Sequence, residues 1–286
     1  MAFEPQRTIK KEASFQGIGL HTGRKCQITF KPAPPNFGIK FVRTDVPGHP
    51  QIEANLANVV DVVRGTTIGR DDVRVYTIEH TLSALFGLEI DNLLIELDDN
   101  EPPVGDGSAK FLVEVFQQAG IENQNEPKRF FSVSKTVEYR ANQTAIRLEP
   151  GNNLEIVCEV IYSHPLIKEQ VMNFRRGDDY SQQIAPARTF CFDFEIEALK
   201  KKGLAKGGSL DNAIVVGHSG IYNTDGKLRF DNEFARHKLL DLMGDLMLFG
   251  SSLKGKLTAQ RCGHGHNIRF LKMLKEKSAI IAVSAG

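Results

Sequence analysis

The chain has 286 residues, of which 41% are hydrophobic and 25% charged, which is typical of a soluble globular protein. Its net charge is +1, and Lys and Arg are spread along the chain, which argues against a nucleic-acid partner. The four cysteines form no CxxC pair, so neither a disulfide framework nor a cysteine zinc site is indicated, and reduced thiols in a cytosol fit best. We find no apolar leader and no membrane-spanning stretch, and therefore expect a cytoplasmic protein.

The first predicted elements are strands, at residues 8–15, 26–30 and 39–43. Between the first two, residues 17–23 contain three glycines, which indicates a tight turn. A phosphate-binding loop is the alternative. Because no GK[ST] follows and the next segment is a strand, we interpret these residues as a hairpin turn.

The first strong helix is predicted at residues 76–87, where Gly87 ends it and where Glu79 and His80 lie side by side. A buried strand is predicted at 91–97, and a turn at 102–109 precedes a helix at 110–119. Residues 120–128 are polar and contain a proline. We place a domain boundary there, which gives domains 1–124 and 125–286.

The second half repeats the first in outline. Residues 28–32 correspond to residues 146–150. The helix with Glu79 and His80 corresponds to a helix with an apolar stripe around His237. The second copy is longer, and its insertion is predicted at 190–221 as a helix-plus-strand flap. Its many apolar side chains indicate either ordinary packing or the wall of an apolar channel.

The helix around His237 carries side chains with metal-ligand spacing. His237 and Asp241 are four residues apart, so both leave one face of the helix, while Asp245 lies one turn further on. Lys238 supplies a charge suited to a phosphate. An ordinary surface ion pair is the alternative interpretation of this spacing, so the rest of the chain must supply further ligands.

Those ligands are expected from the equivalent helix of the first half. If the two helices face each other, His80, His237 and Asp241 converge as two imidazoles and a carboxylate, the ligand set of a catalytic zinc. Glu79, beside His80, is then a candidate general base. No HExxH motif is present, so the common metalloprotease arrangement is excluded.

Two more histidines follow the strand predicted at 256–260. His264 and His266 lie in residues 261–267, which we interpret as a glycine-flanked turn. A protonated His264 paired with Asp245 has a raised pKa and can protonate a leaving amine. His266 is equally well explained as a surface histidine.

Several motifs together resemble one known enzyme family. They are found, in order, at residues 77–80, 101–109, 187–190, 207–213, 229–234, 237–241 and 263–264. The set resembles the UDP-3-O-acyl-N-acetylglucosamine deacetylase family of lipid A biosynthesis, and it covers nearly the whole chain in the right order. The resemblance implies a zinc-dependent amide hydrolase that releases acetate from this UDP-sugar, the committed step towards the lipid A of lipopolysaccharide. It also implies an α+β fold of two similar domains, each a sheet packed on helices, with the site between them.

The resemblance implies a catalytic or metal-binding role for each residue that matches the family's motifs. Glu79 is the general base, His264 is the general acid and Asp245 orients it. Thr189 supplies the hydroxyl that stabilises the oxyanion, a role usually worth several kcal/mol. The implied zinc ligands are His80, His237 and Asp241, which also accept iron(II).

The pattern also implies how substrate is held. Lys238 and Arg261 match substrate contacts, the latter near the diphosphate. The segment at about 190–221 matches the acyl-chain passage, with Phe190, Phe192 and Ile196 among its residues. Tyr162 can stack on uracil. Ile161 stands where relatives have an acidic residue, so the hydrogen bond to uridine lacks its usual carboxylate.

Two other functions fit the sequence less well. A nucleotide-sugar binding or regulatory protein of the same fold is expected to lack Glu79, Thr189 or His264, and all three are present. A hydrolase of another amide, such as a peptidase, needs neither an apolar passage nor a basic pair for a diphosphate. We therefore expect a monomeric deacetylase with a small-molecule substrate.

Overall fold

The computed structural model describes residues 3–283, with side chains described as far as residue 277. The first two and last three residues of the expected domains 1–124 and 125–286 lie outside it. Several sheets pack against helices, which confirms the α+β class. No helix within the described residues has the length and apolarity needed to cross a membrane.

Two five-stranded sheets share one topology. The first has the order β2-β3-β9-β4-β5 and the second β12-β13-β20-β14-β15. In each, the pair formed by the third and fourth strands of that order is parallel and the other pairs are antiparallel. This match confirms the internal repeat. The strands are β2 Ala13–Ile18, β3 Lys25–Pro32, β4 Ile39–Arg43, β5 Gln51–Glu53, β9 Leu93–Leu97, β12 Val137–Ala141, β13 Thr144–Glu149, β14 Leu154–Ile161, β15 Glu169–Arg175 and β20 Gly255–Gln260.

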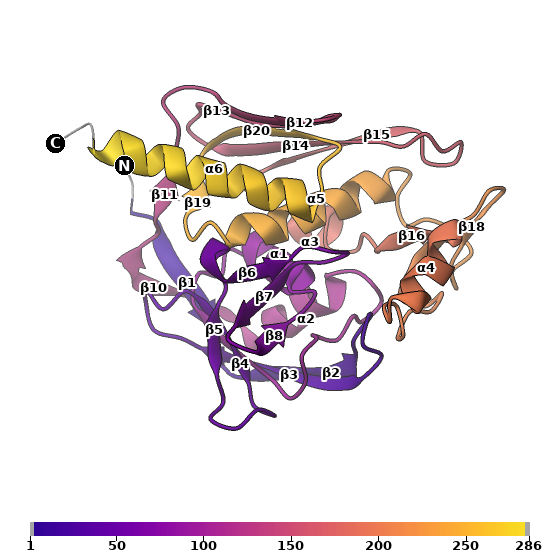
Figure 1. Cartoon of the computed structure of the whole chain (residues 1–286). Coiled ribbons are helices and arrows are strands. Elements are labelled where there is room, and N and C mark those ends of the chain that lie inside the picture. The colour runs from indigo at the N-terminus through magenta and orange to yellow at the C-terminus, as the bar shows by residue number, and fades with distance from the viewer. Residues whose placement is uncertain (1–2, 284–286) are drawn as a thin grey trace.

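The longer helices lie between these sheets. Figure 1 shows the second sheet along the top and the first along the bottom, with the helices sandwiched between them. In each half, one helix precedes the central strand and another follows it, so α1 corresponds to α5 and α2 to α6. Their bounds are α1 Glu79–Gly87, α2 Lys110–Ala119, α5 Glu233–Met247 and α6 His264–Val283.

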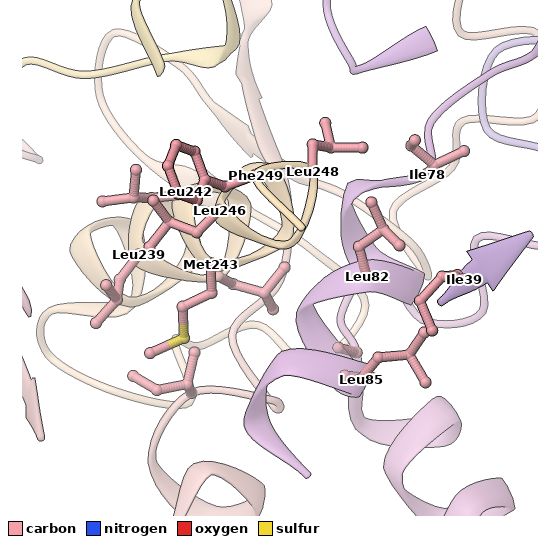
Figure 2. Packing of buried hydrophobic residues seen from close by; sticks show 14 of the residues in the cluster. Ile39, Ile78, Leu82, Leu85, Leu239, Leu242, Met243, Leu246, Leu248 and Phe249 are labelled. Atoms are coloured by element: carbon pink, nitrogen blue, oxygen red, sulfur yellow. The ribbon is translucent and has the colours of Figure 1, made fainter. Parts of the chain in front are cut away.

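The core is continuous across both halves because α1 and α5 pack directly against each other. Figure 2 shows Leu82 and Leu85 of α1 near Ile39, and they belong to the same buried apolar cluster as Leu239 and Met243 of α5. These four side chains of α1 and α5 are fully buried. Burying such side chains contributes roughly 1.5–3 kcal/mol each, so the shared core holds the two helices together.

Each half carries an extra small sheet at an equivalent place in the chain. The first, β6-β7-β8, lies between β5 and α1, and the second, β16-β17-β18, lies between β15 and α5. The remaining elements join or flank the main sheets. Their bounds are β6 Val59–Asp61, β7 Thr67–Arg70, β8 Val73–Val75, β16 Phe190–Phe192, β17 Ile214–Val216, β18 Ile221–Tyr222, α3 Tyr180–Gln183, α4 Ile196–Lys201, η1 Leu56–Asn58, η2 Asp193–Glu195, β1 Pro5–Ile9, β10 Ile121–Pro127, β11 Phe130–Phe131 and β19 Ser252–Leu253.

Three local predictions differ from the structure. Residues 8–15 are not one strand, because β1 ends at Ile9 and β2 begins only at Ala13. The polar segment 120–128 contains β10, which pairs with β1, so the division after residue 124 falls inside a strand. Residues 261–267 are not a turn throughout, since α6 begins at His264. The hairpin predicted at 17–23 is confirmed by the antiparallel pairing of β2 with β3.

Candidate functional site

The packing of α1 on α5 brings two histidines and a carboxylate together. His80 is near the start of α1, whereas His237 and Asp241 lie one turn apart on α5. The Nε2 atoms of His80 and His237 are 3.8 Å and 3.5 Å from Asp241 Oδ1. All three residues are buried, and their ligand atoms lie within 4.8 Å of one another. A second, overlapping group with the same property contains Glu79, Asp241 and His264.

A backbone contact orients the imidazole ring of His237. Its Nδ1 lies 3.1 Å from the carbonyl oxygen of Ala187. Because a carbonyl only accepts, Nδ1 carries the proton, and Nε2 keeps its lone pair towards Asp241. The Ala187 segment is held by Arg188, whose guanidinium donates to the fully buried Glu233 at 2.9 Å.

The charges in the cluster suit a cation. Burial lowers the pKa of His80 to about 3, with His237 adding to the effect, so its imidazole is neutral. Burial also lowers the pKa of His237. Although burial opposes its charge, Lys238 and the histidines hold the pKa of Asp241 below its ordinary value. Two neutral imidazoles beside an ionised carboxylate are the protonation states that a divalent metal requires.

Gly244 allows α1 to approach α5 this closely. A Cβ atom added there would lie 2.1 Å from the backbone oxygen of Glu79, which is shorter than any tolerated contact. Only glycine therefore lets the first turn of α1 pass over α5. The glycine thereby sets the depth at which Glu79 and His80 enter the site.

Glu79 and His264 face each other beside the group of His80, His237 and Asp241. His264 Nε2 is 3.8 Å from Glu79 Oε1 and 3.9 Å from Asp241 Oδ2. Burial raises the pKa of Glu79 to about 7, against the opposing effect of His264. Burial disfavours the charged form of His264, but Asp245 and Glu79 outweigh it and raise its pKa to about 10. The geometry places a carboxylate of raised basicity next to a charged imidazole.

Asp245 holds His264 through a network of hydrogen bonds. Its Oδ2 atom accepts from His264 Nδ1 at 2.9 Å and from Asn267 Nδ2 at 2.8 Å. The other oxygen accepts from the hydroxyl of Thr66 at 2.6 Å. The backbone N–H of Thr66 donates to Glu79 at 2.9 Å. Thr66 therefore links both carboxylates, and Asp245 is completely buried.

Sequence reasoning missed Thr66 and Asn267. Asn267 is three residues after His264, so both lie on one face of α6, a relationship that was hidden because the segment was interpreted as a turn. Thr66 stands alone near the start of β7 and has no spacing that could have identified it.

Aromatic residues named from the sequence gather beside His237. The ring centroid of Phe190 lies 6.2 Å from that of His237 and 5.9 Å from that of Tyr162. Phe192 lies 5.5 Å from Tyr162. The ammonium of Lys238 is 5.6 Å from the centre of the Phe190 ring and 2.8 Å from Asp241.

The remaining candidates are less closely tied to the cluster. Thr189 is two residues after Ala187, whose carbonyl contacts His237, and its own backbone N–H donates to the carbonyl of Gly107. Within the described residues, no hydrogen bond or ring contact joins Ile196 or the Arg261 guanidinium to the group of His80, His237 and Asp241. Arg261 lies just before Cys262 and has a left-handed backbone, with φ of 50°.

A cavity of about 580 Å³ opens beside the start of α1. Gly65 and Thr77, which flank Glu79 in space, lie on one side of it, and Leu204 lies on the other. A smaller cavity of about 180 Å³ lies between Val63 and Phe194. Val63, Lys202 and Leu204 line both cavities, so the two lie next to each other beside α4.

Comparisons with known proteins agree on one family. Residues 6–276 match the family model described as LpxC: UDP-3-O-acyl N-acetylglycosamine deacetylase. A UDP-3-O-acyl-N-acetylglucosamine deacetylase of Myxococcus xanthus is 44% identical over 98% of this chain and 90% of its own length. The protein of that name in Teredinibacter turnerae is 42% identical over 95% of this chain and 90% of its own. A bifunctional enzyme LpxC/FabZ of Chlorobaculum tepidum is 43% identical over 95% of this chain, which spans 64% of that longer relative.

Proposed function

The chain belongs to the LpxC family of UDP-3-O-acyl N-acetylglycosamine deacetylases, and from this premise we propose that it hydrolyses the N-acetyl group of UDP-3-O-acyl-N-acetylglucosamine. The products are acetate and UDP-3-O-acyl-glucosamine, in the biosynthesis of lipid A. The observation that carries the proposal is the meeting of His80, His237 and Asp241 beside Glu79 and His264. Hydrolysis of an amide needs both a base and an acid, and this site holds one of each.

The donor set fits zinc. Two ligand atoms bound to one tetrahedral zinc are about 3.3 Å apart, given metal–ligand lengths of roughly 2.0–2.1 Å. The separations of 3.8 Å and 3.5 Å from Asp241 to His80 and His237 are close to this value. We propose these three residues as the zinc ligands, with iron(II) as the other ion that accepts them. When bound, zinc polarises the amide carbonyl and lowers the pKa of water to roughly 7.

Glu79 and His264 divide the proton transfers. Glu79 removes a proton from the attacking water, and burial supports this role because it raises the pKa of the carboxyl to about 7. His264, charged and held by Asp245, gives a proton to the departing amine nitrogen. The hydroxyl of Thr189 donates a hydrogen bond to the oxygen that gains negative charge. Such a bond stabilises the transition state by about 3–4 kcal/mol in comparable sites.

The surrounding residues supply binding for the rest of the substrate. Lys238 and Arg261 are proposed to contact its anionic groups, with Arg261 near the diphosphate, and Tyr162 to stack on uracil. The acyl chain is proposed to follow residues 190–221, where Phe190, Phe192 and Ile196 are located. Support comes from the cavity between Val63 and Phe194, whose residues are 60% and 73% exposed and offer apolar surface.

Acetate release tests this proposal. Protein treated with a chelator and then given one equivalent of zinc is incubated with UDP-3-O-acyl-N-acetylglucosamine, and in parallel with UDP-N-acetylglucosamine, which lacks the acyl chain. We expect release from the acylated substrate that the chelator abolishes and zinc restores, with a much lower kcat/KM for the other sugar. Folded, zinc-loaded protein that binds the substrate without releasing acetate would contradict the proposal and indicate a binding protein.

A further inference from the structure

Two cysteines lie in contact at the edge of the site. Cys158 is on β14 and is fully buried, whereas Cys262 follows β20 and is partly exposed. Their sulfur atoms are 3.9 Å apart. The parallel pairing of β14 with β20 places Cys158 opposite Ala259, three residues before Cys262. The pairing of these two strands therefore brings the two cysteines close together.

The pair is adjacent to the catalytic machinery. One residue, Gly263, separates Cys262 from His264, and the charges that act on the Cys262 thiol include Lys238 and Asp241. The other two cysteines have no such partner among the described residues, and Cys26 donates to the backbone of Gln27 instead.

We propose that Cys158 and Cys262 are a modification site at which hydrogen peroxide forms a reversible disulfide that switches the deacetylase off. Cys262, the more exposed thiol, is oxidised first: its sulfur attacks one peroxide oxygen and the O–O bond breaks, giving a sulfenic acid and water. Cys158 sulfur then displaces the hydroxyl group from Cys262 sulfur, forming the S–S bond and a second water. Two thiols and one hydrogen peroxide thus give one disulfide and two waters.

Closing the gap between the two sulfur atoms is expected to displace Cys262 rather than Cys158. A disulfide holds its sulfurs about 2.05 Å apart, so the present 3.9 Å must shorten by about 1.9 Å. Cys158 is fixed within β14, which pairs with a strand on each side. Cys262 lies outside the strand, between Arg261 with its left-handed backbone and Gly263.

This movement is transmitted to the proposed general acid. His264 is two residues from Cys262 and is the first residue of α6, where Asp245 fixes its imidazole. Misplacing a catalytic group by about 1 Å can lower a rate by roughly a hundredfold. We therefore expect disulfide formation to lower kcat/KM at least tenfold. The loss of turnover rests on the proposed function, whereas formation of the bond does not.

The test uses the full-length, zinc-loaded protein treated with hydrogen peroxide. Peptide mapping without reductant is expected to find the Cys158 and Cys262 peptides joined, with the mass lowered by two hydrogens. Acetate release is expected to fall at least tenfold and to return with dithiothreitol. The mapping reads out the bond even if the protein has no deacetylase activity, which separates failure of this proposal from failure of the proposed function.

Matched variants decide whether this pair is responsible. Cys262→Ser is expected to keep its basal activity and lose the reversible response, whereas Cys191→Ser is expected to respond as the wild type does. Cys262→Ser also leaves the buried Cys158 in place, so the test does not depend on replacing a core residue. Absence of the joined peptides, or unchanged inactivation and rescue in Cys262→Ser, would overturn the proposal.

Discussion

Thr66 makes two hydrogen bonds that connect Asp245 to Glu79. Its hydroxyl donates to Asp245 at 2.6 Å, and its backbone N–H donates to Glu79 at 2.9 Å. These carboxylates belong to the proposed acid and base sides of the site. A single residue therefore connects the proposed base directly to the carboxylate that holds the proposed acid.

Thr66→Val tests this connection. Valine keeps the shape and the backbone N–H but removes the hydroxyl, so Asp245 loses one donor in a fully buried position. Hydrogen bonds to charged groups contribute roughly 1.5–3 kcal/mol, and we expect the free energy of unfolding to fall by about that amount in urea titrations. Acetate release is expected to fall about tenfold, which corresponds to roughly 1.4 kcal/mol.

The neighbouring Thr67→Val is the matched control. Thr67 is also buried, and its hydroxyl makes no hydrogen bond to a described residue. We expect little change in its unfolding or turnover. Equal behaviour of the two variants would show that the Thr66 hydroxyl has no special role.

Gly244→Ala tests the close approach of α1 and α5. The added Cβ would meet the Glu79 backbone oxygen at 2.1 Å, so the helices must separate. Overpacking of this kind costs roughly 1–3 kcal/mol, and we expect a loss near the upper end together with weaker zinc binding, because His80 moves with α1. Gly265→Ala is the control, since its Cβ would meet Val62 at 3.6 Å, an ordinary contact. Equal stability and zinc affinity in both variants would contradict the account.

The pH dependence of turnover tests the pairing of His264 with Asp245. The general acid must be protonated, and its pKa is raised to about 10, so the alkaline limb of the activity profile is a loss as pH rises through that value. The same sign applies to stability: the imidazolium contribution is fully present below the unfolded pKa of about 6.5 and disappears as pH rises through about 10. A bound divalent cation shifts this limit downward by repulsion.

Asp245→Asn removes the carboxylate that stabilises the charged imidazole. The pKa of His264 is then expected to fall, so the alkaline limb of the kcat/KM profile moves to lower pH than in the wild type. Both proteins are measured with zinc bound. An alkaline limb at the same pH in both would argue against His264 as the acid paired with Asp245.

The repeated architecture and the meeting of His80, His237 and Asp241 could be predicted from the sequence. Apolar periodicity identified the helices now seen as α1 and α5, and their equivalence led to the expectation that His80 would meet His237. This worked because helix faces are set by spacing within a short segment. The roles of these residues stay proposals.

Other features depend on contacts that have no local pattern. β10 is a polar strand that pairs with β1 through its backbone, and the side chains alone indicated a linker. Thr66 acquires its partners Asp245 and Glu79 from distant parts of the chain. The start of α6 at His264 was missed because glycines on both sides of that residue indicated a turn.

His80 is proposed to hold the metal, while Glu79 performs the proton transfer. The most direct measurement is zinc per protein and acetate release in the same preparations of wild type, Glu79→Gln and His80→Ala. We predict that Glu79→Gln keeps about one zinc and loses roughly 10²–10⁴-fold in kcat, whereas His80→Ala loses both zinc and turnover. Near-normal release by Glu79→Gln, or full zinc retention by His80→Ala, would contradict the account.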